Sequence, residues 1–507
     1  MTTEDTHSTT DADDTVSYVQ AIRRRLLTDG TGVVLVDEDR GYTGHELLGL
    51  VARLAGAMTT HDIGRGHRVA LVAPATGEAV AARYAASSLG AATVFCPDAG
   101  SPERLRVFLS RTSADFVIVF PSTAHAVSDV VDARVLSVGP VDGLPNLMLD
   151  AAAGGIDRAL HVEISPDDEC VLVATGGTTG VSKASVRTQR EYRRLVDLGP
   201  TPGRRQLICT PLAYIAQTLM DTVLLGGGCV HLHDGFVPTQ VLATIAQARI
   251  THLALVEPLL VDLIDSDALP GTDLSSVIAI SHVGADAAAS LRRRLVLRMG
   301  RSALANPYGA SEFGVVSVLA GPEYSAGSPH LGTSGRPLPM VDLEIRGDDG
   351  ALCLSGEQGV IHVRTPAQAH RYSVAPPRPG FTDDGWFDTG DVGVLDVDGY
   401  LTVRGRSGDM RRTDAGDTFP VDLQDTLCAH AQVRYAVAVP APDRAPGAFG
   451  VVVTLCPGAT VTTDDLKAHL DQARPGLGDV TIVIVDAVPV TEQGKPHRAD
   501  ITSLLFS

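Results

Sequence analysis

The chain has 507 residues, 44% hydrophobic and 20% charged, which is typical of a globular protein of about two to four domains. Its net charge is −19, from 60 acidic and 41 basic residues. Nucleic acids and anionic membranes repel so acidic a protein, so neither is expected as a partner. No apolar stretch reaches the ~20 residues that span a bilayer, and the start lacks the pattern of a signal peptide. These features predict a cytoplasmic protein.

Lysine is rare in this sequence, which has only Lys183, Lys467 and Lys495 among its 41 basic residues. Arginine replaces lysine harmlessly on most surfaces, but a site that needs a compact ammonium group does not tolerate the exchange. Lys183 and Lys495 are therefore candidate site residues, whereas Lys467 lies on a predicted helix and is expected to be a surface charge. The seven cysteines form no CxxC pair, which predicts reduced thiols rather than disulfides or a zinc site.

From about residue 17 to 345, short β-branched runs alternate with helical patterns. This alternation predicts βαβ units on largely parallel sheets. Residues 330–405 carry Asp-Gly turns, which predict an antiparallel β subdomain, and a compact α+β module is expected from about 409 onward. The clearest strands are predicted at 32–37, 68–73, 115–120, 169–174, 433–439 and 450–455, and the clearest helices at 43–58, 77–89, 238–248 and 463–473.

The segment Ala174-Thr-Gly-Gly-Thr-Thr-Gly-Val-Ser-Lys-Ala184 follows a predicted buried strand. Its glycines let the backbone approach an anion closely, and its amides and Thr hydroxyls can cradle phosphate oxygens. It is not a Walker A motif, because two residues separate Gly180 from Lys183. The alternative, a flexible Gly/Thr turn, is disfavoured by the order Thr-Thr-Gly-x-x-Lys.

This segment resembles the phosphate-binding signature of the ANL superfamily, which comprises acyl- and aryl-CoA synthetases, peptide-synthetase adenylation domains and luciferases. Further segments resemble family motifs in the same order, at 284–286, 306–312, 386–391 and 489–498. The resemblance implies the ANL fold, an α/β fold with a large N-terminal domain of parallel βα layers plus a β subdomain, and a small mobile α+β C-terminal domain. The expected boundaries are a disordered acidic tail at 1–15, the adenylation domain at 16–406 with its β subdomain at about 330–405, and the C-terminal lid at 407–507.

The resemblance also assigns roles to single residues and implies ATP and Mg²⁺ as cofactors. Tyr308 would stack on adenine, Asp391 would bind the ribose hydroxyls, and Glu312 would help to hold Mg²⁺. Lys495 would be the catalytic lysine between the carboxylate and the α-phosphate, where its charge stabilises the reaction. The predicted ATP-binding residues are Thr175, Gly176, Gly177, Thr178, Thr179, Gly180, Lys183, Gly284, Ala285, Asn306, Tyr308, Ser311, Asp391 and Arg406.

The predicted hinge, at Ser407, Gly408 and Asp409, departs from the family pattern because Gly408 replaces the usual Asp or Lys. After it, Asp414-Ala415 replaces a glycine pair. In thioester-forming relatives that loop lines the pantetheine tunnel, so the two added side chains argue against CoA as acceptor. The alternative is that Gly416 supplies the turn after a one-residue slip.

The predicted acid pocket departs from the family pattern too, because Tyr214 replaces a common His. If a helix follows, Tyr214, Gln217 and Asp221 share one of its faces. A carboxylate in so apolar a helix needs a partner or a task, so Asp221 is a candidate base for an incoming amine, with an exposed or structural role as the alternative. The predicted pocket residues are Tyr214, Gln217, His282, Gly309 and Ala310, and small neighbours leave room for a flat aromatic acid.

The sequence therefore predicts an ATP-dependent ligase that adenylates an aryl or heteroaryl carboxylic acid and transfers the acyl group to an amine. In this it resembles stand-alone amide-bond synthetases of the β-carboline carboxylate type from actinobacterial secondary metabolism. The alternatives are an acyl- or aryl-CoA ligase, a diazotase that activates nitrite, and a non-catalytic nucleotide-binding relative. Retention of both Lys183 and Lys495 argues against the last. The identity of the acid and the oligomeric state stay open.

Overall fold

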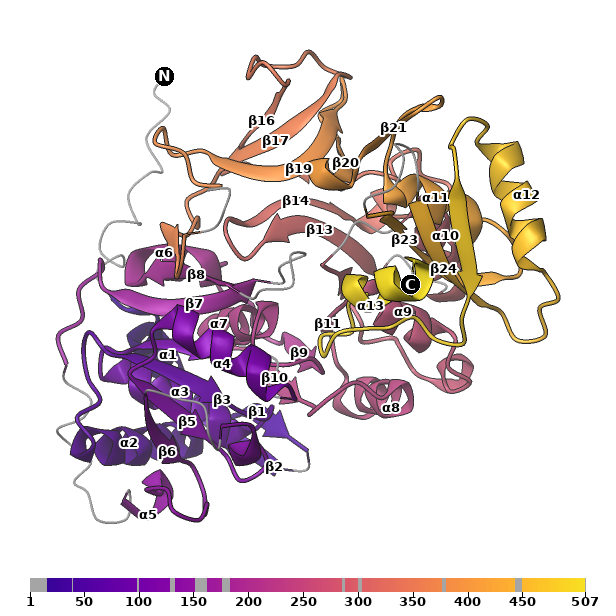
Figure 1. Ribbon diagram of the computed structural model, residues 1–507. Coiled ribbons are helices and arrows are strands. Elements are labelled where there is room, and N and C mark those ends of the chain that lie inside the picture. Colours follow the sequence, from indigo (N-terminus) through magenta and orange to yellow (C-terminus); the bar gives the residue numbers. More distant parts are fainter. Residues whose placement is uncertain are drawn as a thin grey trace, which may run out of the picture. The chain divides into compact units, whose positions relative to one another are not determined.

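The computed structural model describes residues 16–38, 40–97, 100–127, 133–150, 162–175, 183–284, 288–299, 303–375, 380–442 and 449–506 (Figure 1). The chain forms two compact units. The first contains the residues up to Gly235 together with 311–314 and 366–377, and the second contains 236–310, 315–365 and 378 onward. The predicted tail at 1–15 lies outside the described residues, and the predicted boundary at 406/407 stays a prediction. Within the described ranges, no helix combines the length and apolar character needed to cross a membrane.

The first unit is an α/β structure. Its elements are α1 (Tyr18–Thr28), β1 (Val33–Asp37), β2 (Arg40–Thr43), α2 (Gly44–Thr60), β3 (Arg68–Val72), α3 (Gly77–Ser88), β4 (Ala92–Phe95), α4 (Pro102–Thr112), β5 (Phe116–Val119), η1 (Ala124–Ala126), β6 (Arg134–Ser137), α5 (Leu147–Asp150), β7 (Glu169–Thr175), β8 (Lys183–Thr188), α6 (Gln189–Val196), β9 (Arg205–Ile208), α7 (Ile215–Gly226), β10 (Cys229–Leu232) and β18 (Arg371–Tyr372). One sheet has the order β18-β8-β7-β4-β3-β5-β6, and a second contains β9-β10-β1-β2. The strands from β7 to β6 are parallel, as predicted, whereas β8 and β18 join antiparallel.

The larger sheet of this unit is buried on both faces, which explains the continuous apolar runs in its strands. In β3, Val69 and Leu71 face a core that also contains side chains of α1, α2, α3 and α7. The alternate residues Ala70 and Val72 face a second core, to which α4 contributes. Strand side chains alternate between faces, so one short apolar strand belongs to both cores.

The second unit contains strand β14, which begins at the boundary, and the remaining elements. They are α8 (Pro238–Ala248), β11 (His252–Leu255), α9 (Glu257–Ile264), η2 (Leu269–Gly271), β12 (Ala279–His282), α10 (Ala289–Met299), β13 (Leu304–Ala310), β14 (Gly314–Ala320), η3 (Gly321–Glu323), β15 (Arg336–Pro337), β16 (Asp342–Arg346), β17 (Gln358–Arg364), β19 (Phe387–Leu395), β20 (Leu401–Arg406), η4 (Ser407–Asp409), β21 (Arg411–Thr413), β22 (Gly416–Thr418), α11 (Pro420–Cys428), β23 (Val433–Pro440), β24 (Phe449–Leu455), α12 (Thr463–Ala473), β25 (Val480–Ile484) and α13 (Arg498–Phe506). The strands β11, β12 and β13 are neighbours in one parallel sheet.

The predicted β region contains the antiparallel sheet β16-β17-β19-β20. One strand of that region, β18, is not part of this sheet, because it pairs with β8 of the first unit. The C-terminal module is α+β, as predicted, with the sheet β23-β24-β25. Apolar side chains of α11 and α12, such as Leu423 and Leu466, share a core with this sheet.

Candidate functional site

The predicted phosphate loop lies between two strands that pair with each other. Strand β7 ends at Thr175, β8 begins at Lys183, and these two residues are partners in the antiparallel register. The predicted residues Gly176, Gly177, Thr178, Thr179 and Gly180 lie outside the described residues. The Thr175 hydroxyl is buried and has no hydrogen-bond partner within the described ranges. A buried polar group of this kind needs a partner, and a bound anion would supply one.

Ser311 and Glu312 lie beside these strand ends, in the first unit. The Ser311 hydroxyl donates to the carbonyl of Ala174 (3.4 Å), and the Ser185 hydroxyl donates to the carbonyl of Ser311 (2.9 Å). The Glu312 carboxylate accepts a hydrogen bond from the Tyr372 hydroxyl (2.9 Å). The structure therefore brings together residues from the phosphate motif and the 306–312 motif, as the sequence predicts.

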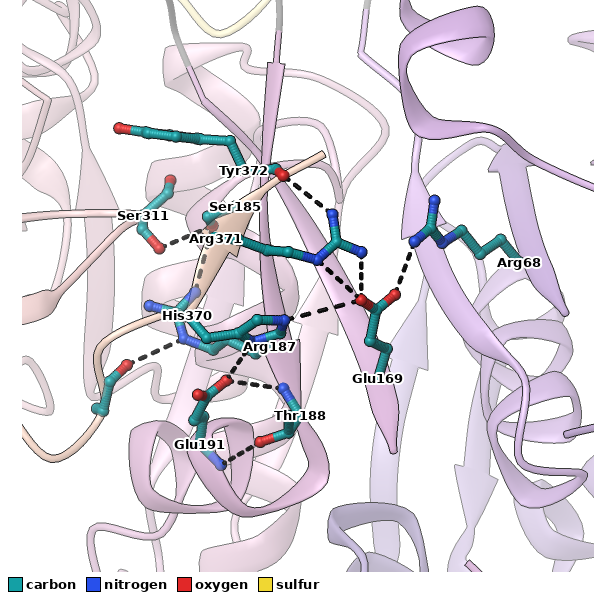
Figure 2. Close-up of polar contacts among 11 residues, drawn as sticks. Arg68, Glu169, Ser185, Arg187, Thr188, Glu191, Ser311, His370, Arg371 and Tyr372 are labelled. Carbon is teal, nitrogen blue, oxygen red and sulfur yellow. Dashed lines mark hydrogen bonds and ion pairs between the residues drawn. The ribbon is translucent and has the colours of Figure 1, made fainter. Parts of the chain in front are cut away.

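A cluster of charged side chains lies next to these residues, and sequence analysis did not identify it. Figure 2 shows Arg68 and Arg371 converging on the Glu169 carboxylate, with N–O distances of 2.8 and 3.0 Å. The His370 ring bonds Glu191 through Nδ1 (2.9 Å), and its Nε2 lies 3.7 Å from Glu169. We call Glu169, Glu191, His370 and Arg371 the ionic clamp. It ties β18 to β7 and α6, and no local sequence signal links residues so far apart.

The ionic clamp shifts the pKa values of its members. Hydrogen bonding to Glu169 and then to Glu191 raises the pKa of His370 to about 9, so the imidazole is a cation at neutral pH. The bond to His370, with those to the two arginines, lowers the pKa of Glu169. Burial alone would raise the pKa of Glu191, but the bonds from His370 and the Thr188 amide outweigh it and lower the value. Glu169, Glu191 and His370 are thus ionised and close to one another at neutral pH.

The second unit brings together the predicted adenine and ribose residues. The Tyr308 hydroxyl donates to Asp391 (2.8 Å), and Arg406 Nε lies 2.9 Å from the same carboxylate. Arg406 also donates to the carbonyl of Thr389 (2.8 Å), which fixes its direction. Burial, followed by the charge of Asp391, raises the pKa of Tyr308 well above its usual value, so the phenol stays protonated. A carboxylate so oriented can accept from the two hydroxyls of a ribose.

Asn306 and His282 lie deeper in this unit. With the amide of Asn306, a residue of strand β13, turned so that its oxygen faces Arg292, that oxygen accepts a hydrogen bond from the guanidinium (2.9 Å). His282 is fully buried, and burial lowers its pKa well below 6.5, so the ring is neutral. Neither His282 ring nitrogen has a hydrogen-bond partner within the described ranges. Of the other predicted residues here, Gly309 is exposed, Ala310 is half-buried, and Ala285 lies outside the described residues.

Lys495 lies against Gly284. This contact is expected if the segments 284–286 and 489–498 both contact one ligand. Gly284 has φ +93°, and a Cβ built there would lie 2.5 Å from Cε and 3.1 Å from Nζ of Lys495. The lysine is presented by a tight turn in which the Thr491 amide donates to the Lys495 carbonyl (2.7 Å). Glycine at 284 therefore gives the lysine side chain its space.

The predicted hinge residues Ser407, Gly408 and Asp409 form the short turn η4. Asp409 makes a two-pronged ion pair with Arg498, with distances of 2.6 and 2.8 Å. Arg498 begins α13, three residues after Lys495. The hinge is therefore linked directly to the segment that carries the lysine.

Asp221 is not placed where a catalytic base must be. Its side chain is 0% exposed and pairs with both terminal nitrogens of Arg83, each at 2.8 Å. The hydroxyls of Tyr84 and Tyr192 also donate to it, each at 2.6 Å. These four bonds occupy the lone pairs of a carboxylate. The predicted base role is therefore wrong for this arrangement, and the structural alternative describes Asp221.

The remaining pocket residues of the first unit are Tyr214 and Gln217. Helix α7 begins at Ile215, and Tyr214 precedes it with φ +66°, which costs a bulky residue strain energy. Gln217 is fully buried, and within the described part of the chain its amide has no hydrogen-bond partner. Like His282, it is a buried polar group that a ligand or a water could satisfy.

The loop that follows the predicted hinge is a hairpin of β21 and β22, with Asp414 and Ala415 at its turn. The Ala415 amide donates to the carbonyl of Gly476 (3.3 Å), and Asp414 packs against the same glycine. Gly416 adopts φ +96°, so it is the left-handed residue of this turn. This is the alternative in which the family's glycine position is shifted by one residue. The turn thus follows that alternative, so Asp414 and Ala415 give no argument against CoA as acceptor.

The residues present fit a magnesium ion that a nucleotide shares. No group of three or more His, Cys, Asp or Glu side chains within the described ranges could hold a metal by itself. Mg²⁺ typically binds through one or two carboxylates together with substrate phosphates. Glu312 offers the carboxylate, and Thr175 and Lys183, partners at the ends of β7 and β8, offer groups that could bind the phosphates. All seven cysteines lie in the described ranges, and none of them forms a disulfide.

Comparison with known proteins agrees with these motifs. The sequence model of a family described as AMP-binding enzyme matches residues 23–373. A feruloyl-CoA synthase from Amycolatopsis is 29% identical over 90% of this chain and 92% of its own length. The medium/long-chain-fatty-acid–CoA ligase FadD8 from Mycobacterium tuberculosis is 29% identical over 75% of this chain and 70% of its own. Among solved structures, the amide bond synthetase McbA from Marinactinospora thermotolerans is 28% identical, with a TM-score of 0.85, and the match covers 97% of this chain and 100% of that one.

Proposed function

Because the chain belongs to the AMP-binding enzyme family and has the ANL fold expected from its motifs, we propose that it adenylates an aryl or heteroaryl carboxylic acid and transfers the acyl group to an amine. Its family members are adenylate-forming ligases that use ATP. The observation that carries the proposal is the position of the lysines. In a chain with three lysines, one stands at the end of the phosphate loop and another lies against Gly284.

The proposed chemistry has two steps. A carboxylate oxygen attacks the α-phosphorus of ATP, the bond to the β-phosphate oxygen breaks, and pyrophosphate leaves. The amine nitrogen then attacks the acyl carbon, the bond to the phosphate oxygen breaks, and AMP leaves. The amine loses a proton to solvent in that second step, and the four hydrogen bonds that Asp221 accepts argue against this residue as the base.

Each proposed role follows from charge and position. Lys495 would stabilise the negative charge that accumulates between carboxylate and α-phosphate, a large effect in a water-poor site. Lys183 and the Thr175 hydroxyl would bind phosphate oxygens, and Tyr308 with Asp391 would hold the nucleoside. Mg²⁺ held by Glu312 would neutralise part of the phosphate charge.

The amine acceptor is supported by one observation. The amide bond synthetase McbA is 28% identical over 97% of this chain. The second candidate is transfer to CoA, which is favoured by the similarity to feruloyl-CoA synthase over 90% of the chain.

The test is acid-dependent exchange of pyrophosphate with ATP and Mg²⁺ across aryl, heteroaryl and fatty acids, with nitrite included. We expect exchange with aryl or heteroaryl acids. Lys495→Ala should abolish it, whereas Lys467→Ala is the matched control, because Lys467 is an exposed residue of α12 that lies 4.0 Å from Asp471. Amines and CoA are then added and the products identified by mass.

The outcomes separate the candidates. An amide without CoA-dependent product supports the proposal, and a CoA thioester replaces it with the second candidate. Exchange with nitrite alone points to the diazotase alternative. Exchange that survives Lys495→Ala contradicts the role of this lysine.

A further inference from the structure

One face of β8 carries a row of polar side chains. Residues two apart in a strand point to the same side, so Lys183, Ser185 and Arg187 share this face. In the antiparallel register with β18, Tyr372 stands opposite Ser185. Directly opposed residues share a face, and diagonal neighbours lie within reach of long side chains. The register therefore places the Tyr372 side chain diagonally across from Lys183.

Tyr372 contacts two predicted site residues at once. Lys183 Nζ lies 3.6 Å from the centroid of the Tyr372 ring, a cation–π contact. The hydroxyl of the same tyrosine donates to Glu312 Oε1 (2.9 Å). The phenol thus connects the lysine at the phosphate loop with the carboxylate proposed for Mg²⁺, and none of the sequence motifs includes it.

The position of Tyr372 is fixed from both sides. The Ser373 amide donates to the Ala184 carbonyl (2.8 Å), and the Ala369 amide donates to the Glu312 carbonyl (2.8 Å). The two residues immediately before the tyrosine, His370 and Arg371, belong to the ionic clamp (Figure 2). Four charged groups therefore hold a strand of only two residues in register.

We propose that Tyr372 is a positioning residue that orients Glu312 for Mg²⁺ and Lys183 for the phosphates of ATP, and that the ionic clamp holds it there. The inference rests on the proposed function, because it concerns the metal and phosphates of that site. Hydrogen bonds to a ligating carboxylate typically affect metal affinity by about 10–100-fold. Tyr372 does not itself touch the reacting atoms in this scheme.

The experiment is calorimetric titration of the full-length protein with ATP plus Mg²⁺, with ATP plus EDTA, and with AMP. Tyr372→Phe keeps the ring over Lys183 and removes the hydroxyl that donates to Glu312. Tyr372→Leu also removes the ring. The matched control is Tyr42→Phe, because the buried Tyr42 phenol also donates to a carboxylate, that of Glu78 (3.1 Å), outside the proposed site.

We expect Tyr372→Phe to bind Mg²⁺–ATP about tenfold more weakly and to leave binding of AMP and of metal-free ATP unchanged. Tyr372→Leu should also weaken the binding of metal-free ATP, because Lys183 loses its contact with the tyrosine ring. Tyr42→Phe should match the wild type in every titration.

If the wild-type protein binds the ligands as expected, either of two results would overturn the role of Tyr372 without affecting the proposed function. One is a Tyr372→Phe protein with unchanged Mg²⁺–ATP affinity. The other is an equal loss for all three ligands, which indicates general damage to the fold. A wild-type protein that binds none of the three ligands overturns both this inference and the proposed function.

Discussion

The substitution Asp221→Asn tests whether the buried ion pair with Arg83 is structural. Both side chains are 0% exposed, and their N–O distances are 2.8 Å. Burial alone would lower the pKa of Arg83, but the charge of Asp221 outweighs it and holds the value well above normal. An asparagine at 221 would leave this guanidinium charged, buried and without its counter-ion.

The expected magnitude follows from that uncompensated charge. Breaking a buried pair by removing one partner costs about 3–5 kcal/mol of unfolding free energy. For a unit of roughly 150–250 residues, each kcal/mol lowers the melting temperature by about 2–4 °C, so we expect Asp221→Asn to melt about 6–20 °C lower. The hydroxyls of Tyr84 and Tyr192, which also donate to Asp221, would add to the loss.

The assay is thermal unfolding of the wild type, Asp221→Asn, Asp221→Leu, Arg83→Met and the double variant Arg83→Met/Asp221→Leu. The double variant removes both charges, so it should be more stable than the sum of the single effects predicts, by about 2 kcal/mol or more. Adenylation and amide formation should fall together, in step with the folded fraction. An Asp221→Asn protein with wild-type melting that loses only acyl transfer would refute the structural assignment.

Two further predictions concern the site and the clamp. Gly284→Ala should lower kcat for pyrophosphate exchange by about 10–100-fold, because the added Cβ would displace the Lys495 side chain. Gly284 also has φ +93°, a conformation that strains alanine. Unchanged exchange kinetics would contradict the close contact. His370 has its pKa raised from 6.5 to about 9. Its stabilising effect should therefore be complete below about pH 6.5 and be lost as the pH rises through 9. The melting difference between wild type and His370→Gln should disappear over that range; a constant difference from pH 6 to 10 would contradict an ionised clamp.

Much of the fold could be predicted because local patterns determine its elements. The apolar run at 68–73 became β3, and the helix predicted at 238–248 is α8 with the same bounds. The exception is β18, a strand of two residues. So short a segment has no periodicity of its own, and its place depends on pairing with β8 and on ion pairs with Glu169 and Glu191, which are distant in the chain.

The candidate site divides in the same way. Lys183, Ser311 and Glu312 lie together in the first unit, and Tyr308 contacts Asp391 in the second, while their roles toward ATP stay predictions. These residues sit in segments whose order of residues itself indicates phosphate or nucleoside binding. Tyr372 belongs to no such segment, so its contact with Lys183 could be found only in three dimensions.

Asp221 shows why the wrong prediction was reasonable and how the structure corrects it. The helix and the shared face with Gln217 were predicted correctly, and both side chains are buried. Helical spacing reveals which residues share a face but not what that face meets. The partner Arg83 lies 138 residues away and matches the carboxylate in charge and in number of donors. Gln217, by contrast, has no hydrogen-bond partner within the described ranges, so of the two it is the better candidate for contacting the acid.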